Sequence, residues 1–70
     1  MTTSTNTAEL AHRENDGVEV SLLWSKRCRR LTVVVSDWRA AQAFELTAHP
    51  ENALDVFHHP YAYAALQGII

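Results

Sequence analysis

The stretch from Val18 to Asp37 reads VEVSLLWS, then KRCR, then RLTVVVSD, and it decides the fold that the sequence predicts. Side chains along a strand point alternately to opposite faces, so alternation of apolar and polar residues indicates a strand. Both eight-residue runs alternate in this way, and both are rich in β-branched or aromatic residues. The inward-facing sets are Val18, Val20, Leu22 and Trp24 in the first run, and Leu31, Val33 and Val35 in the second. The stretch therefore predicts two antiparallel strands joined by a basic turn.

A third strand is predicted from Ala43 to Thr47, where Phe44 and Leu46 share the inner face. The connection from Trp38 to Gln42 has no Gly or Asn for a tight primed turn, so we expect a longer loop. Three consecutive strands with short connections form an antiparallel meander.

Helical structure is predicted after the third strand, beginning at His49-Pro50, because proline is favoured at the first helical position. Pro60 interrupts this segment, since the residue before a proline avoids helical angles. It either ends the helix near His58 or begins a second helical piece, Tyr61 to Gln67, with Gly68 as the C-terminal stop. The predicted fold class is thus α+β: a three-stranded meander followed by a C-terminal helix, intact or broken at Pro60.

The N-terminal residues 1–16 are rich in Thr, Asn and charged residues, and besides Met1 their one large apolar side chain is Leu10. Such a segment buries too little apolar surface to offset the entropy of ordering it, so we expect a disordered tail. Asn15-Asp16-Gly17 has turn chemistry and marks the entry to the first strand. The predicted domain therefore spans residues 17–70.

A domain of this size has a marginal core and normally needs a disulfide, a metal or a partner chain. The single cysteine, Cys28, excludes an intramolecular disulfide and favours a reducing compartment. No apolar run is long enough to span a bilayer, and the first residues lack the features of a secretory signal. We expect a cytoplasmic protein that does not bind membranes.

The run DVFHHPYAYAA (Asp55 to Ala65), together with the strand pattern ending in Phe44-Glu45-Leu46, resembles short uncharacterised proteins of actinobacteria. The resemblance covers roughly residues 17–65. It implies a bacterial cytoplasmic setting, and it carries over no activity, ligand or functional residue.

The basic turn is the first candidate site, although the net charge of the chain is −2. A β-ribbon that carries Arg and Lys can enter a nucleic-acid groove, and Trp24 or Trp38 could stack on an unpaired base. Cys28 lies between two of the arginines, which favours its thiolate. The alternative is a solvated turn whose charges discourage aggregation. The basic patch consists of Lys26, Arg27, Arg29 and Arg30.

The histidines give weaker signals, and we predict no metal and no cofactor. His58 and His59 are adjacent, so on a helix they would point about 100° apart, which does not suit a shared metal ion. A helix between His49 and His58 would separate these two by roughly 13 Å. The ordinary alternative is a histidine near a helix C-terminus.

The apolar surface is the most informative feature for function. One short helix covers one face of the sheet, while Leu23 and Val34 lie on the other face, and soluble monomers seldom expose a large apolar patch. We therefore predict a small interaction or regulatory protein that is a homodimer or binds a larger protein. The alternatives are a compact monomer and a weak nucleic-acid-binding module. No motif for a nucleophile or a phosphate loop occurs, so we do not expect an enzyme. The predicted partner contacts are Leu23, Val34, Phe57, Tyr61 and Tyr63.

Overall fold

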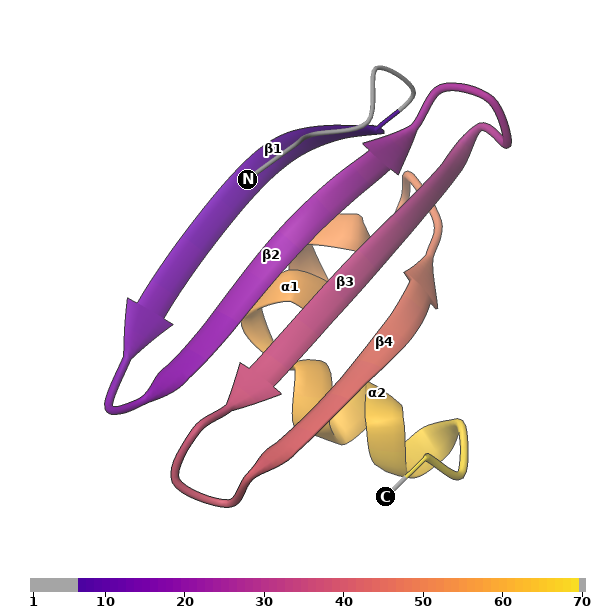
Figure 1. Ribbon diagram of the computed structural model, residues 1–70. Helices are drawn as coiled ribbons and strands as arrows, with labels where there is room; N and C mark the ends of the chain where they lie inside the picture. The colour runs from indigo at the N-terminus through magenta and orange to yellow at the C-terminus, as the bar shows by residue number, and fades with distance from the viewer. Residues whose placement is uncertain (1–6, 70) are drawn as a thin grey trace.

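The computed structural model describes residues 7–69 and shows an α+β fold with one antiparallel sheet and two short helices (Figure 1). The strands follow the chain across the sheet in the order β1-β2-β3-β4, so each pairs with its neighbours in sequence. Both helices lie on one face of the sheet, and no helix formed by residues 7–69 lies on the other face. The elements are β1 (Thr7–Asn15), β2 (Val18–Ser25), β3 (Arg30–Asp37), β4 (Gln42–Ala48), α1 (Ala53–His58) and α2 (Pro60–Leu66).

The central hairpin is confirmed with the predicted bounds: β2 and β3 are joined by residues 26–29. Val20 opposes Val35 and Leu22 opposes Val33, so the inward sets of the two strands coincide. Arg29 takes a positive φ of 51° to close the turn. The apolar alternation thus fixes the register, because a slip of one residue would turn each apolar set toward solvent.

The prediction of three strands and a disordered N-terminal tail is wrong for residues 7–15, which form β1 beside β2. Residues 1–6 of the predicted tail lie outside the described residues.

β1 contributes no large apolar side chain to the core, and its stability comes from main-chain pairing with β2 and from Arg13. The Arg13 guanidinium donates to the carbonyl oxygen of Phe57 from Nη2 (2.9 Å) and from Nε (3.3 Å). It also lies over the Phe57 ring, 5.4 Å from its centroid. Arg13 therefore joins β1 to the C-terminal end of α1.

The turn before β2 explains why β1 pairs with it. Asp16 and Gly17 have φ values of 53° and 82°, and they form a two-residue connection between the paired residues Asn15 and Val18. Positive φ at both positions is the requirement of a type I′ hairpin turn, for which Asp-Gly is a preferred sequence.

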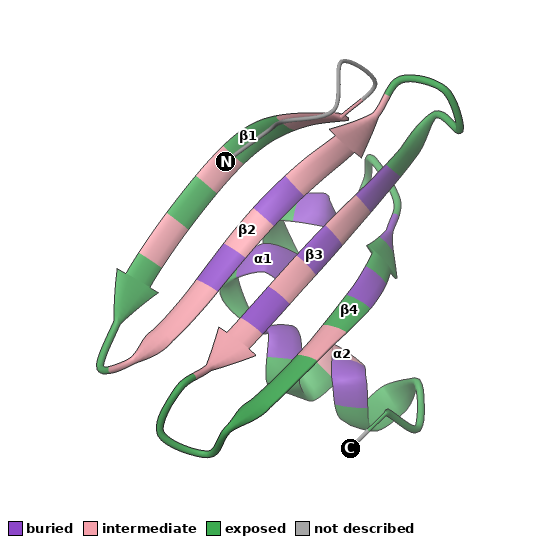
Figure 2. Ribbon diagram, in the orientation of Figure 1, coloured by how far each residue is buried: buried purple, intermediate pink, exposed green. Residues whose placement is uncertain are grey.

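The core lies between the sheet and the helices (Figure 2). Buried residues alternate with half-buried ones along β2 and β3, as expected for a sheet covered on one face. The buried side chains are Val20, Leu22, Leu31, Val33, Val35, Leu46, Ala48, Ala53, Val56, Phe57 and Ala64.

The helical region is shorter than predicted at its start. α1 begins at Ala53 rather than at Pro50, because His49 to Asn52 forms a turn in which Asn52 Oδ1 accepts from the His49 N–H (2.8 Å). Of the two alternatives left open at Pro60, the broken helix is the one found: α1 ends at His58, and Pro60 is the first residue of α2.

α2 ends in a Schellman motif at Gly68, as the glycine suggested. The Ile69 N–H donates to the Ala64 carbonyl (2.9 Å), the Gly68 N–H donates to the Ala65 carbonyl (3.2 Å), and Gly68 has a φ of 74°. None of the described helices is long and apolar enough to cross a membrane.

Candidate interaction surface

The sheet face opposite the helices, which we call the open face, carries the side chains that alternate with the core. Leu23 lies opposite Thr32 on this face, and Val34 lies between Ser21 and Glu45. Leu23 and Val34 are half-buried among these neighbours, and no described segment covers them. The predicted position of both residues is therefore confirmed, although the surrounding residues are more polar than a continuous apolar patch would require.

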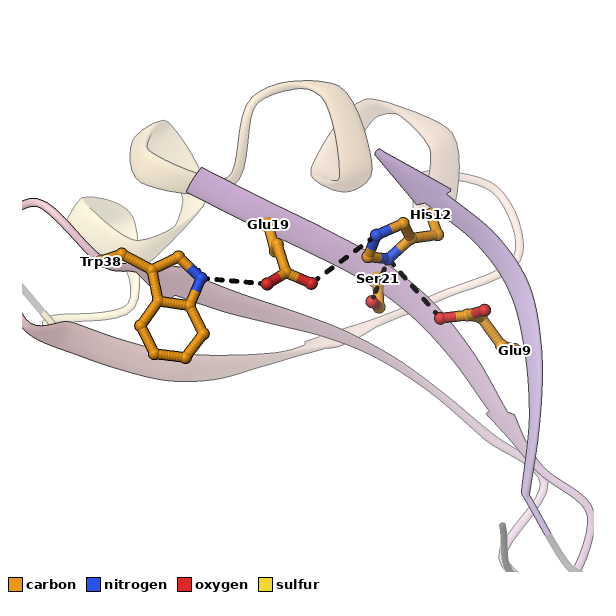
Figure 3. Close-up of polar contacts among 5 residues, drawn as sticks. All are labelled: Glu9, His12, Glu19, Ser21 and Trp38. Atoms are coloured by element: carbon orange, nitrogen blue, oxygen red, sulfur yellow. Dashed lines mark hydrogen bonds and ion pairs between the residues drawn. The ribbon is translucent and has the colours of Figure 1, made fainter. Parts of the chain in front are cut away.

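A polar network on the open face joins β1 to the end of β3 (Figure 3). His12 Nδ1 lies 2.9 Å from Ser21 Oγ and 3.6 Å from Glu9 Oε1. On its other side, His12 Nε2 lies 3.7 Å from Glu19 Oε1. His12 therefore contacts side chains from both strands of the first hairpin. Sequence reasoning missed this network because it placed Glu9 and His12 in a disordered tail.

Trp38 extends the network at the margin of the open face. Its indole Nε1 donates to Glu19 Oε2 at 2.9 Å, while 68% of the residue is exposed (Figure 3). Exposed Trp residues with a fixed orientation are frequent hot spots in protein interfaces, since they supply contact area at small entropic cost. The indole borders a hollow of about 350 Å³, which is lined by Ser36, Asp37, Trp38, Ala41, Gln42 and Ala43.

The predicted contact Tyr61 is 37% exposed and lies on the helical side, where it makes two contacts with the sheet. Its hydroxyl donates to Asp37 Oδ2 (3.0 Å), and its ring meets Phe44 edge-on with centroids 5.5 Å apart. Burial, followed by this hydrogen bond to Asp37, raises the pKa of Tyr61 above 10.0. Hydrogen bonding from the Ala40 N–H, aided by Tyr61 and Arg39, lowers the pKa of Asp37 below 3.8 despite desolvation.

The other two predicted contacts also serve the fold. Tyr63 is half-buried against the core, and its hydroxyl donates to Asp55 of α1, which raises the pKa of Tyr63. Phe57 is only 5% exposed and packs in the core beneath Arg13. Its prediction as a surface contact was therefore wrong, because it occupies the inner side of α1.

A groove of about 410 Å³ separates the first turn from the junction of α1 and α2. Arg13, Arg39, His58 and His59 line it together with the acidic residue Asp16. The Arg13 guanidinium donates hydrogen bonds to main-chain carbonyls of α1. Arg39 Nε lies 3.9 Å from Asp37 Oδ1. The groove thus brings basic groups together, but carboxylates and carbonyls already neutralise or occupy part of them.

The basic patch lies at the opposite end of β2 and β3. Lys26, Arg27, Arg29 and Arg30 are exposed, as is the free Cys28, and no ion pair involves these four cations within residues 7–69. Ser25 Oγ accepts from the Cys28 N–H at 3.4 Å.

A hollow of about 180 Å³ beside this patch is lined by Cys28 and His49, among others. His49 is therefore separated from His58 and His59, which line the groove. In the described part of the chain, no three histidine, cysteine or carboxylate side chains form a group that could hold a metal ion.

Comparisons with protein-family models, curated proteins and solved structures gave no match to this chain. The resemblance of residues 17–65 to short actinobacterial proteins stays a prediction.

Proposed function

We propose that this chain is a small protein-interaction or regulatory module of the bacterial cytoplasm, which acts by binding rather than by catalysis, as a homodimer or on a larger protein. The observation that carries the proposal is the open face: no segment of residues 7–69 covers Leu23 and Val34 there, and Trp38 is fixed at its margin by Glu19. The free and exposed Cys28 suits a reducing compartment.

The physical basis is the arrangement of small polar residues around a few apolar ones. Interface cores pack apolar and aromatic side chains within a polar rim, and bulk hydrophobicity does not distinguish most interfaces from other surface. The open face has this composition, with Ser21, Thr32 and Ser36 around Leu23 and Val34. Glu9, Glu19 and Glu45 lie on the same face and would favour a partner with complementary basic groups.

Arginine substitutions on the sheet and on the helical layer test whether the open face is the binding surface. Leu23→Arg and Val34→Arg place a charge on the open face, whereas Leu54→Arg places the same charge on α1, where Leu54 is 65% exposed. Each protein is used for affinity capture from its native cell, and each captured protein is purified and titrated against the chain by calorimetry.

We expect one protein to bind the wild type and Leu54→Arg directly and to bind the two open-face variants at least tenfold more weakly. If the wild type and the three variants bound the captured protein equally, the open face would be excluded as the binding surface. The absence of both a direct partner and self-association at micromolar concentration would exclude the proposed function.

A second candidate function is weak nucleic-acid binding through Lys26, Arg27, Arg29 and Arg30, favoured by their exposure and by the lack of carboxylate partners among the described residues. The aromatic residues do not support it. Trp24 packs against the core, and Trp38 lies at the far end of the eight-residue β3, roughly 26 Å from the patch at about 3.3 Å per residue.

Titration of labelled DNA and RNA at several salt concentrations tests this candidate. Neutralisation of four phosphates predicts a slope of log K against log salt of at most about 3.6 in magnitude on double-stranded DNA. The variant Arg27→Ala, Arg29→Ala should reduce that slope by about half, while Arg39→Ala, outside the patch, should leave it unchanged. A failure to bind at low salt excludes this function.

A further inference from the structure

The two edges of the sheet, β1 and β4, differ in how they are protected against pairing with another strand. Edge strands present unpaired N–H and C=O groups, and natural proteins protect them with bulges and charges. β1 has a register shift between Glu9 and Ala11, and it carries Glu9, Arg13 and Glu14. β4 keeps regular pairing with β3 from one end to the other, and Glu45 is its one charged residue. The β4 edge is therefore open to another strand.

The hydrogen bonding of the sheet identifies the groups that point outward from β4. Trp38 N–H donates to the Gly17 carbonyl (2.8 Å), one residue beyond the pair Val18 and Asp37. This pair is thus not hydrogen-bonded, and the main-chain groups of Asp37 point toward Gln42 of β4 instead. Because the two kinds of pair alternate along a strand, the outward residues of β4 are Ala43, Glu45 and Thr47.

The C-terminal helix supplies a second surface at the same edge. α2 lies beside β4 through the contact of Tyr61 with Phe44, and it crosses behind β4 so that its C-terminal end lies beyond that strand (Figure 1). Leu66 is 81% exposed there, and Ile69 is exposed as well. A strand added to β4 would extend the sheet over these side chains.

The composition of this edge suits an interface. In residues 42–48 and 60–69 together, Glu45 is the one charged residue. Depletion of charged residues is the compositional mark of an interface core. The main-chain groups of β4, the exposed apolar end of α2 and the low charge all lie at one edge of the molecule.

We propose that a second copy of this chain pairs antiparallel with β4 across a two-fold axis, so that two sheets join into one continuous sheet with the two α2 ends beneath it. This inference rests on the homodimeric form of the proposed function and assigns its surface. A two-fold arrangement is self-complementary, because each copy offers the same strand and the same helix end. It also leaves both open faces free for a further protein.

The hydrogen bonds select one register. With Glu45 on the two-fold axis, Ala43 faces Thr47 of the second copy, and all three outward residues are paired. An axis through Leu46 would place Ala43 opposite His49, whose N–H is already bonded to Asn52 Oδ1. An axis through Phe44 would place Thr47 opposite Ala41, which has a φ of 51° in the preceding turn. The selected register sets Glu45 against itself, a like-charge contact that costs less than the lost hydrogen bonds.

Two substitutions at Glu45 test the pairing, because both remove the charge and only one removes the N–H. We expect the wild type to sediment with twice the 7.9 kDa mass of one chain at micromolar concentration. Glu45→Gln should lower the dissociation constant about two- to fivefold, through loss of the repulsion. Glu45→Pro should be monomeric at the same concentration, and circular dichroism should show it folded, because this N–H is not used within the sheet.

Glu14→Pro is the matched control, since by the same alternation the Glu14 N–H points outward from the β1 edge. It should remain dimeric. A second measurement, in the Cys28→Ser background, mixes Ala43→Cys chains with Thr47→Cys chains. Paired residues about 5.5 Å apart are within disulfide reach, so the mixture should form a cross-linked dimer much faster than either chain alone.

A wild type that dimerises while Glu45→Pro also dimerises, and Leu23→Arg does not, would overturn the β4 pairing and leave the proposed function standing. A wild type that is strictly monomeric would overturn the β4 pairing and the homodimeric form. Binding of a larger protein would still be decided by the capture experiment.

Discussion

At the scale of single residues, the turns carry much of the specificity of this small sheet. Asp16, Arg29 and Ala41 have positive φ values without being glycines, so three connections contain a residue in the left-handed region. Such conformations cost energy in non-glycine residues and persist where neighbouring contacts hold them. At the turn after β3, Asp37 Oδ1 accepts from the N–H groups of Arg39 and Ala40 and supplies such contacts.

Gly17→Ala should destabilise the fold more than Gly68→Ala. Gly17 has a φ of 82°, and an added Cβ would lie 3.0 Å from Arg39 Cγ. Gly68 has a φ of 74° with no atom within 4 Å of that position. We expect a cost of about 1–2 kcal/mol at Gly17 and about 1 kcal/mol or less at Gly68, measured by urea denaturation. Equal costs would show that Arg39 does not restrict the turn.

Asp37→Asn should remove a pH-dependent part of the stability. The pKa of Asp37 is lowered in the fold, so its contribution is present above the ordinary value of 3.8 and is lost as the pH falls below 3.8, through the lowered pKa. The variant should melt below the wild type at neutral pH, and the difference should shrink over that acid range. A difference that stays constant with pH would show that the carboxylate charge is not involved. Glu51→Asn is the control, since Glu51 is exposed in a turn.

At the scale of elements, the sequence predicts those that bury alternating apolar residues and fails for the one that does not. β2 and β3 are predicted with their bounds because Val20, Leu22 and Val33 leave a clear period of two. In β1 the inward positions include Ala8, Ala11 and Arg13, and the register shift between Glu9 and Ala11 interrupts the period. The available signal was Asp16-Gly17, a type I′ turn sequence that implies a strand on each side.

The candidate site also has a part that the sequence predicts and a part that it does not. The positions of Leu23 and Val34 follow from the predicted hairpin. The network of His12 with Glu9 and Glu19 could not be predicted without β1. Ala53 and Phe57 are four residues apart, so the helical period puts both on the side of α1 that lies on the sheet, and the assignment of Phe57 as a surface contact disregarded that period.

Arg13→Met tests the attachment of β1 to α1. The Arg13 guanidinium donates to the Phe57 carbonyl, where α1 ends, and methionine keeps an apolar stem without these donors. We expect a loss of about 1.5–3 kcal/mol in the free energy of unfolding, as for hydrogen bonds to charged groups. Arg27→Met, in the exposed turn, should change it by less than about 0.5 kcal/mol. A neutral result at Arg13 would mean that main-chain pairing alone holds β1.

At the scale of the whole molecule, the protein is a two-layer plate with principal extents of 31 × 28 × 17 Å. All of the buried apolar side chains lie in one layer between sheet and helices. A single core of this kind in so short a chain rarely supplies more than about 3–5 kcal/mol. One substitution at its centre should therefore remove most of the stability.

Leu46→Ala is the sharpest probe of that core, because Leu46 is 1% exposed and is the largest of the fully buried side chains. Such truncations cost about 2–5 kcal/mol, so the variant should be largely unfolded at 37 °C by circular dichroism. Leu54→Ala removes the same atoms from an exposed position and should melt close to the wild type. If both variants melted alike, the core would not be the source of the stability.

The strand order, in which each strand lies beside its predecessor in the chain, has a consequence for biosynthesis. Topologies built from local contacts fold quickly, because no long loop must close before a strand finds its place. As the polypeptide leaves the ribosome, each new strand meets a neighbour that has already emerged. The apolar face of this sheet stays exposed to water until the residues of α1 and α2 have also emerged and packed against it. A chain truncated shortly before Ala53 would therefore keep the apolar face of its sheet exposed, and it would be prone to aggregation and proteolysis.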